Sequence, residues 1–228
     1  QQCHSGGALM IGGVLNLDQL FKAINETLYM TAVSLVLATV LGLLIGILLY
    51  CTQTGGLFQN KIINRVIDVI INVLRAIPFI ILLIILIPFT KLIVGSMLGA
   101  TAALPSLVFA AAPFYARMCI IAFQDVNKGT IEASKAMGAS NWQIILKVLL
   151  PEALPSLISG ITVTGISLIS YTAMAGAIGA GGLGNLAYLY GFARRNDLIL
   201  YTSTIIIIVI VFAIQWMGDA IVKRIDKR

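Results

Sequence analysis

The chain has 228 residues, of which 59% are hydrophobic and only 11% charged, and its mean hydropathy is +1.01. Because a soluble domain carries about 25% charged residues, this composition excludes an ordinary soluble protein and indicates a membrane protein. The net charge of +6 therefore points to membrane topology and contact with anionic lipid. Nucleic-acid binding is excluded, because no basic soluble surface with interleaved aromatic residues is present.

Five apolar runs are each long enough to cross a bilayer, which takes about 20 residues. Inside lipid every backbone N–H and C=O needs a partner within the protein, so these runs are expected to be helices. The alternation typical of a transmembrane β-barrel is absent. The sequence therefore predicts an all-α polytopic membrane protein with five transmembrane helices, at about 27–50, 66–88, 102–123, 154–178 and 198–221.

The spans belong to one predicted transmembrane domain over 20–228, preceded by an external segment over 1–19. That segment lacks the basic start and compact apolar core of a cleavable signal peptide. Because the sequence begins at Gln1 and not at Met, the natural start is expected to differ, and no functional role is predicted for residues 1–13.

Basic residues are divided unequally between the two sides of these spans, with ten on the side of the C-terminus and four on the other. By the positive-inside rule, the N-terminus is expected outside and the C-terminus in the cytoplasm. The ten are Lys61, Arg65, Arg117, Lys128, Lys135, Lys147, Lys223, Arg224, Lys227 and Arg228, and the four are Lys22, Lys91, Arg194 and Arg195.

Two motifs mark the first two spans. Gly42-x-x-x-Gly46 is a helix-packing motif, for which close packing is the expected role. Pro78 removes a backbone donor, so it is expected to kink or break the second span and could act as a hinge. Arg75 is costly in lipid and lies seven residues after Asp68, on the same helical face. Two interpretations stay open: a salt bridge within or between subunits, or a role on a substrate pathway.

A polar loop over 125–153 follows the third span, and its first half is predicted to be a short helix. Thr130 is expected to N-cap this helix, with Glu132 in the first turn, where the helix dipole favours negative charge. Gly138 is expected to end it in the left-handed conformation.

The second half of the loop is predicted to be another short helix. Ser140 and Gln143 match the capping-box pattern, and Pro151 marks the return to the membrane. Periodicity leaves two interpretations equally open, a helix pair lying on lipid or a docking surface for a protein. The predicted apolar stripe of this helix is Trp142, Ile145, Leu146 and Leu149.

The glycine-rich stretch Gly179-Ala180-Gly181-Gly182-Leu183-Gly184 satisfies GxGxxG. A dinucleotide site would need a βαβ unit around it, whereas a membrane span precedes this one. The glycines are instead expected to permit tight turns and positive φ angles, or to line a gate.

Several kinds of chemistry are missing from the sequence. It has no GxxxxGK[ST] phosphate loop, no Ser/His/Asp set and no paired carboxylates, so no catalytic residues are predicted. The acids Asp68 and Asp219 are peripheral, which disfavours an ion-coupled carrier. A metal site is not expected, because the three cysteines, Cys3, Cys51 and Cys119, are isolated and His4 is the only histidine.

The pattern Glu132-Ala133-Ser134-x-x-x-Gly138 with Leu150-Pro151 resembles the EAA loop of ABC importer permeases, with Ser134 where that loop has alanine. From about residue 20 to the end, the chain is similar to the methionine importer permease family. The stretches that carry this resemblance are Arg75-Ala76-Ile77-Pro78-Phe79-Ile80-Ile81-Leu82-Leu83, Ala111-Ala112-Pro113-Phe114 with Ala116-Arg117-Met118, Lys147-Val148-Leu149-Leu150-Pro151-Glu152-Ala153-Leu154-Pro155, and 176–191.

The resemblance implies a type I ABC importer permease fold in a bacterial cytoplasmic membrane. Two copies of this chain would form the pathway, two copies of a separate ATPase would bind ATP and Mg²⁺, and an extracytoplasmic binding protein would deliver methionine. This chain would bind no cofactor itself. The alternatives are an ABC permease for another small solute, a non-transporting membrane scaffold, and an ion-coupled carrier.

The resemblance also assigns roles to particular residues. Those implied to dock on the ATPase are Glu132, Ala133, Ser134, Ala136, Met137, Gly138 and Ala139. Those expected to set the loop geometry are Ser140, Gln143, Leu150 and Pro151. Apart from the resemblance, the proline, arginine and glycine patterns described above place an expected hinge or gate at Arg75, Pro78, Gly179, Gly181, Gly182 and Gly184.

Overall fold

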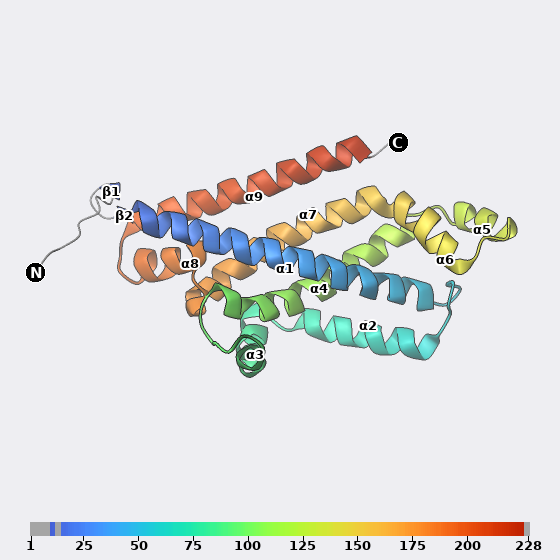
Figure 1. The fold of residues 1–228 in the computed structure, drawn as a ribbon, viewed down its shortest axis with the longest axis horizontal. Helices are drawn as coiled ribbons and strands as arrows, with labels where there is room; N and C mark the ends of the chain where they lie inside the picture. Colours follow the sequence, from blue (N-terminus) through green and yellow to red (C-terminus); the bar gives the residue numbers. More distant parts are fainter. Residues whose placement is uncertain (1–9, 12–14, 226–228) are drawn as a thin grey trace, which may run out of the picture.

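The computed structural model describes residues 10–11 and 15–225, and these are almost entirely helical, which confirms the all-helical membrane architecture (Figure 1). The sequence did not predict the small antiparallel hairpin of β1 (Met10–Ile11) and β2 (Leu15–Asn16) that precedes the first helix. The helices are α1 (Leu17–Thr52), α2 (Lys61–Ala76), α3 (Phe79–Val94), α4 (Ala100–Gln124), α5 (Lys128–Ala136), α6 (Asn141–Ile144), η1 (Ile145–Leu149), α7 (Leu150–Ala175), η2 (Gly176–Ala180), α8 (Gly182–Asn185), η3 (Leu186–Phe192) and α9 (Asp197–Ile225).

The long helices run back and forth between two ends of the molecule (Figure 1). The start of α1 and the short helix α8 lie at one end, called here the α8 end. Helices α5 and α6 lie at the other, called the α5/α6 end. Within the described residues, four helices are long and apolar enough to cross a membrane, and the bent pair α2 and α3 makes a fifth pass.

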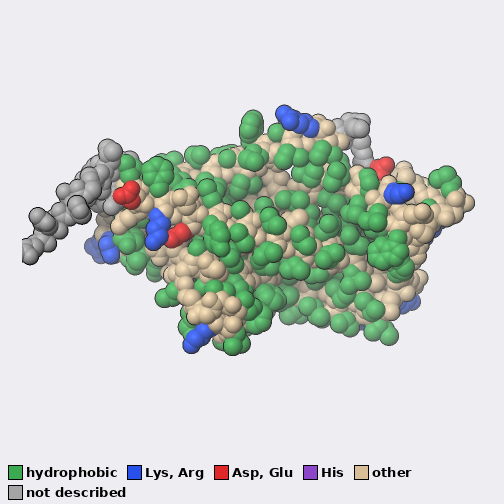
Figure 2. Space-filling model, viewed as in Figure 1, with side chains coloured by type: hydrophobic (Ala, Val, Ile, Leu, Met, Phe, Trp, Pro, Cys, Tyr) green, Lys and Arg blue, Asp and Glu red, His purple; other side chains and the backbone are tan. Residues whose placement is uncertain are grey.

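The surface of the bundle is apolar over most of its length. Figure 2 shows hydrophobic side chains covering the middle of the visible face, with charged side chains mainly toward the two ends. In the most apolar stretch of α9 only 11% of the residues are buried. Such a surface suits lipid or another membrane-embedded chain, and not water.

The second pass is not the single helix over 66–88 that hydropathy predicts. Helices α2 and α3 meet at Pro78 with a bend of 108°. Because proline lacks an N–H and disfavours the helical conformation in the residue before it, Ile77 adopts an extended backbone with φ −75° and ψ 124°. The predicted break at Pro78 is therefore confirmed, and it divides the second pass into two helices.

Helices α1 and α4 pack closely through two glycines of α1. A Cβ on Gly42 would lie 2.8 Å from the carbonyl oxygen of Ala112, and one on Gly46 would lie 2.6 Å from Cys119 Cβ. The packing role predicted for the GxxxG motif is confirmed. Against this contact lies a buried cluster that includes Tyr115, whose hydroxyl donates to the Leu157 carbonyl of α7 at 3.4 Å.

The fourth pass begins inside the polar loop. Helices α6, η1, α7 and η2 follow one another as a helical run of 40 residues, Asn141–Ala180. Pro151 lies in the first turn of α7 and does not interrupt the run, since a proline there removes a donor that the first turn does not need. Pro151 thus lies where the chain enters the long apolar helix α7, the position predicted for the return toward the membrane.

Candidate functional site

The loop between α4 and α7 forms a helical hairpin of α5 and α6, called here the α5–α6 hairpin (128–144). Asn127, and not Thr130, caps α5: its side-chain oxygen accepts a hydrogen bond from the N–H of Gly129 at 2.8 Å. The helix therefore begins earlier than predicted, and Glu132 lies beyond its first turn. The predicted first-turn position of Glu132 is wrong.

The end of α5 is fixed by its own backbone. Gly138 has φ +83°, its N–H donates to the Lys135 carbonyl at 3.0 Å, and the Ala139 N–H donates to the Ser134 carbonyl at 3.1 Å. This pair of bonds is the Schellman motif. The left-handed glycine predicted at this position is confirmed.

The start of α6 carries the predicted capping box. Ser140 Oγ accepts from the Gln143 N–H at 3.3 Å, and Gln143 Oε1 accepts from the Ser140 N–H at 2.8 Å. In addition, Asn141 Nδ2 donates to the Leu57 carbonyl in the α1–α2 connection at 2.9 Å. The hairpin is thus held at both helix ends and tied to a second loop.

The predicted apolar stripe divides between two faces. Ile145 and Leu149 are fully buried, whereas Trp142 and Leu146 are 64% and 60% exposed. The wider π-helical turn of η1 interrupts the 3.6-residue period on which the prediction rested. Trp142 packs on Phe58 with ring centroids 5.8 Å apart, so its outer face is left at the surface.

Most of the residues proposed for docking form the outer surface of the hairpin. Ala133, Ala136 and Gly138 are exposed, and Met137 is 81% exposed. Glu132 is exposed as well, but on the side of α5 that borders a cavity. Ala139 is partly buried. Ser134 is buried, and its hydroxyl donates to the Thr130 carbonyl at 2.8 Å, so it belongs to the inner face of α5.

A cavity of about 500 Å³ lies between α5 and the α1–α2 connection. Lys128, Glu132 and Lys135 of α5 line it, together with Gln53 after α1 and Gln124 at the end of α4. The hairpin is therefore separated from its neighbours by a partly polar space on one side.

The glycine-rich stretch lies at the α8 end, opposite the hairpin. Gly179, Gly181 and Gly182 have φ angles of +107°, +83° and +76°, which confirms the expected tight turns. The turn lets the chain leave η2 and begin α8. There the Gly182 N–H donates to Glu26 and the Leu183 N–H to Thr27, both on α1.

Sequence patterns did not identify Glu26 and Thr27 as partners of this turn. The signal available in the sequence was a carboxylate near the start of an apolar helix, with Lys22 one turn earlier. In the structure, Lys22 Nζ lies 3.9 Å from Glu26 Oε1. Gly184 packs against the backbone of Ala173, so it serves close packing.

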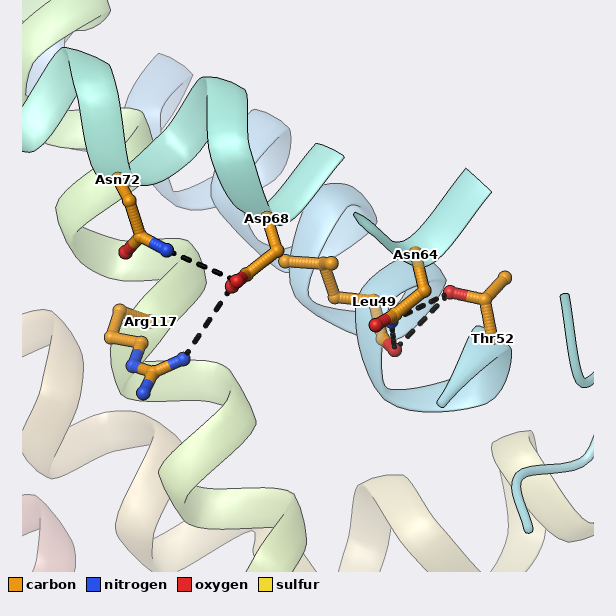
Figure 3. A network of polar contacts seen from close by, with 6 residues as sticks. All are labelled: Leu49, Thr52, Asn64, Asp68, Asn72 and Arg117. Carbon is orange, nitrogen blue, oxygen red and sulfur yellow. Dashed lines mark hydrogen bonds and ion pairs between the residues drawn. The ribbon is translucent and has the colours of Figure 1, made fainter. Parts of the chain in front are cut away.

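The charged residues of α2 make different partners from those expected (Figure 3). Asp68 Oδ1 lies 3.8 Å from Arg117 Nη1 on α4, and Asn72 Nδ2 donates to Asp68 Oδ2 at 3.1 Å. Asn64 Nδ2 donates to the Leu49 carbonyl at 2.8 Å. Within the described chain, Arg75 has no hydrogen bond or ion pair, so of the interpretations left open, a salt bridge between Asp68 and Arg75 of the same copy is not formed.

Comparison with known proteins places this architecture in a family. The model for "binding-protein-dependent transport system inner membrane component" matches residues 38–228. The methionine import system permease protein MetP of Bacillus subtilis is 54% identical, over 94% of this chain and 96% of that protein. The probable D-methionine transport system permease protein MetI of Pasteurella multocida is 50% identical, over 89% and 94%.

A solved structure agrees with these relatives. A chain of the MetNI methionine ABC transporter in an inward-facing conformation superposes with a TM-score of 0.91 at 45% identity, covering 92% of this chain and 98% of that one. The protein therefore belongs to the family of binding-protein-dependent transport system inner membrane components.

Proposed function

We propose that this chain is the transmembrane permease subunit of an ATP-driven importer for methionine. The observation that carries the proposal is the α5–α6 hairpin, a rigidly capped surface that projects from an otherwise apolar helical bundle. The methionine permeases to which the chain is similar over nearly its whole length support the choice of cargo.

In this proposal the outer surface of the hairpin docks into a cleft of a separate ATPase, which binds ATP and Mg²⁺. Met137 is suited to fill an apolar pocket, since it is the most exposed apolar side chain of the hairpin. Ala133 and Ala136 permit close approach, and Glu132 offers a polar contact. Ser134 contributes from inside, because its hydroxyl bonds to the α5 backbone and not to a partner.

The same contacts provide a route for coupling. The hairpin leads without a break into α7, and Asn141 ties it to the α1–α2 connection. Closure of the ATPase pair would therefore shift both loops together and move the membrane helices between inward- and outward-open arrangements. Ser140, Gln143, Leu150 and Pro151 set the geometry of this connection.

Two copies of the chain, two ATPase subunits and an extracytoplasmic binding protein make up the proposed assembly, with lipid around it. The N-terminus lies outside and the C-terminus in the cytoplasm, as the distribution of basic residues favours. Movement in the membrane is proposed at the Arg75–Pro78 break and at the turn formed by Gly179, Gly181, Gly182 and Gly184.

Copurification tests the partner. The tagged chain, expressed with the Walker-motif ATPase of its own genome, is expected to form a stable complex, whereas a scaffold would purify without it. In proteoliposomes that hold permease, ATPase and binding protein, labelled methionine should accumulate only with ATP. Competition by an unlabelled solute other than methionine would reassign the cargo, and uptake abolished by an ionophore without need of ATP would indicate an ion-coupled carrier.

A further inference from the structure

Helix α2 is divided lengthwise into a polar face and an apolar face. At 100° per residue, all its polar side chains fall within one arc of about 100°, and this arc is called here the polar face of α2. The remaining surface of the helix is entirely apolar. The polar face consists of Lys61, Asn64, Arg65, Asp68, Asn72 and Arg75.

The packing of α2 leaves this polar face uncovered. The helix rests on α1 and α4 through Ile67 and Ile71, beside Leu49 and Ile120. Lys61, Arg65, Asn72 and Arg75 are exposed. The arc on the other side of the helix is also exposed but carries only apolar side chains: Ile62, Ile63, Val66, Val69, Ile70 and Val73.

The polar face reaches far along a helix that lies beside membrane-spanning neighbours. Helix α2 runs next to the second half of α1 and of α4 (Figure 1). Arg75 lies ten residues, or about 15 Å, beyond Arg65 along the axis, and three residues before the break at Pro78. Lipid at that depth has no group that satisfies a guanidinium, so such a residue faces protein or water.

Contacts within the chain satisfy only part of this face. Asp68 is engaged by Arg117 and Asn72, and Asn64 is bonded to the end of α1 (Figure 3). Among the described residues, neither Arg75 nor Arg65 has a hydrogen bond or ion pair. Asp68 is thus already engaged by Arg117 and Asn72. Arg75, the cation farthest along the polar face from the start of α2, is therefore available to bind a ligand.

Resting on the proposed function, we propose that the polar face of α2, with Arg117, lines the water-filled inner half of the substrate pathway between two copies of the chain. Arg75, at its deep end, binds the carboxylate of the amino acid in transit. The face carries Lys61, Arg65 and Arg75, and with Arg117 these oppose the single carboxylate of Asp68. A guanidinium binds a carboxylate through two parallel hydrogen bonds.

Thiol accessibility tests the water-filled pathway without reference to the cargo. Asn72→Cys on the polar face and Val73→Cys on the apolar face are compared in the assembled transporter, with Cys3 replaced by serine. Cys51 and Cys119 are buried, so the background is low. The charged reagent methanethiosulfonate ethylsulfonate should modify Asn72→Cys at least tenfold faster than Val73→Cys. Equal rates would overturn the pathway, and protection of both thiols would assign the face to contact between copies.

Uptake tests the role of Arg75. Arg75→Gln should lower the maximal rate of methionine uptake at least tenfold, with the half-saturating concentration unchanged because the binding protein sets it. ATP hydrolysis stimulated by loaded binding protein should persist, and Arg75→Lys should recover at least a third of the rate. Lys91→Gln, an exposed cation at the end of α3, serves as the control and should be unchanged.

The two arms separate the possible failures. Undiminished uptake by Arg75→Gln would overturn the carboxylate contact. A wild-type transporter that accumulates no methionine would overturn the proposed cargo. The modification rates of Asn72→Cys and Val73→Cys would still decide whether water reaches the polar face of α2. If less Arg75→Gln than wild type reaches the membrane, uptake is divided by the amount of transporter present. Uptake by Arg75→Lys then shows whether the loss is due to the missing positive charge.

Discussion

Glu26 Oε2 accepts a hydrogen bond from the backbone N–H of Gly182 at 2.7 Å, across 156 positions of sequence. The next residue of each segment repeats the contact, since Thr27 Oγ1 accepts from the Leu183 N–H at 2.8 Å. The first N–H groups of a helix have no partner within it. Helix α1 therefore supplies, from a distance, the cap that the glycines before α8 cannot provide.

Replacing Glu26 by alanine should destabilise the α8 end. The Gly182 N–H would lose its partner in a partly buried position, which costs about 1–3 kcal/mol. Thermal unfolding in detergent should show a lower midpoint. Lys22→Ala is the matched control, because Lys22 is highly exposed and only touches Glu26 in a long ion pair. A midpoint shift no larger than that of the control would contradict the capping role.

Gly138→Asp should abolish methionine uptake while the protein still reaches the membrane. A Cβ at this position meets nothing within 4 Å, so the change alters the left-handed turn and adds charge to the docking surface without a clash. Gly95→Asp is the control: Gly95 also ends a helix with positive φ in open space, but on α3. Normal uptake and normal stimulated ATP hydrolysis in Gly138→Asp would refute the docking role.

Met137→Ala should weaken ATPase binding about tenfold, or ~1.4 kcal/mol, because truncating an apolar anchor at an interface removes its burial. Binding of purified ATPase to permease in nanodiscs measures the change. Met174→Ala, which removes a half-exposed methionine of α7, should leave the affinity unchanged. Equal affinity of both variants would place Met137 outside the interface.

Gly46→Ala should destabilise the bundle, whereas Gly165→Ala should be tolerated. The new methyl group at 46 would lie 2.6 Å from Cys119 Cβ and 3.1 Å from the Ala116 carbonyl oxygen, which cannot move independently. At 165 the nearest atom, 3.4 Å away, is the end of the Leu35 side chain. Overpacking costs about 1–3 kcal/mol, so the unfolding midpoint should fall for Gly46→Ala only.

Local rules predicted much of this structure. The break at Pro78, the left-handed Gly138 and the capping box of Ser140 and Gln143 each depend on residues within a few positions of one another. One local prediction was wrong because two residues could cap α5. Asn127 precedes Thr130 and begins the helix earlier, which moves Glu132 out of the first turn.

Contacts between distant segments could not be predicted in this way. The partner of Asp68 is Arg117 on another helix and not Arg75 on its own, because packing of α2 on α4 decides which charges meet. The same holds for Asn141 and Leu57, which join two loops 84 positions apart. The predicted stripe assumed 3.6 residues per turn throughout. It therefore could not include the wider π-helical turn that begins at Ile145 and divides the stripe between two faces.

Helix α7 carries a small tilt of the hairpin to the opposite end of the molecule as a larger displacement. Its 26 residues, at 1.5 Å each, make a rod about 39 Å long, which ends before the non-helical Gly179. Each degree of tilt displaces one end relative to the other by about 0.7 Å. A tilt of about two degrees therefore yields, near the glycine turn held by Glu26, a displacement of about 1.4 Å, which is within the 1–2 Å range of helix shifts in switching proteins.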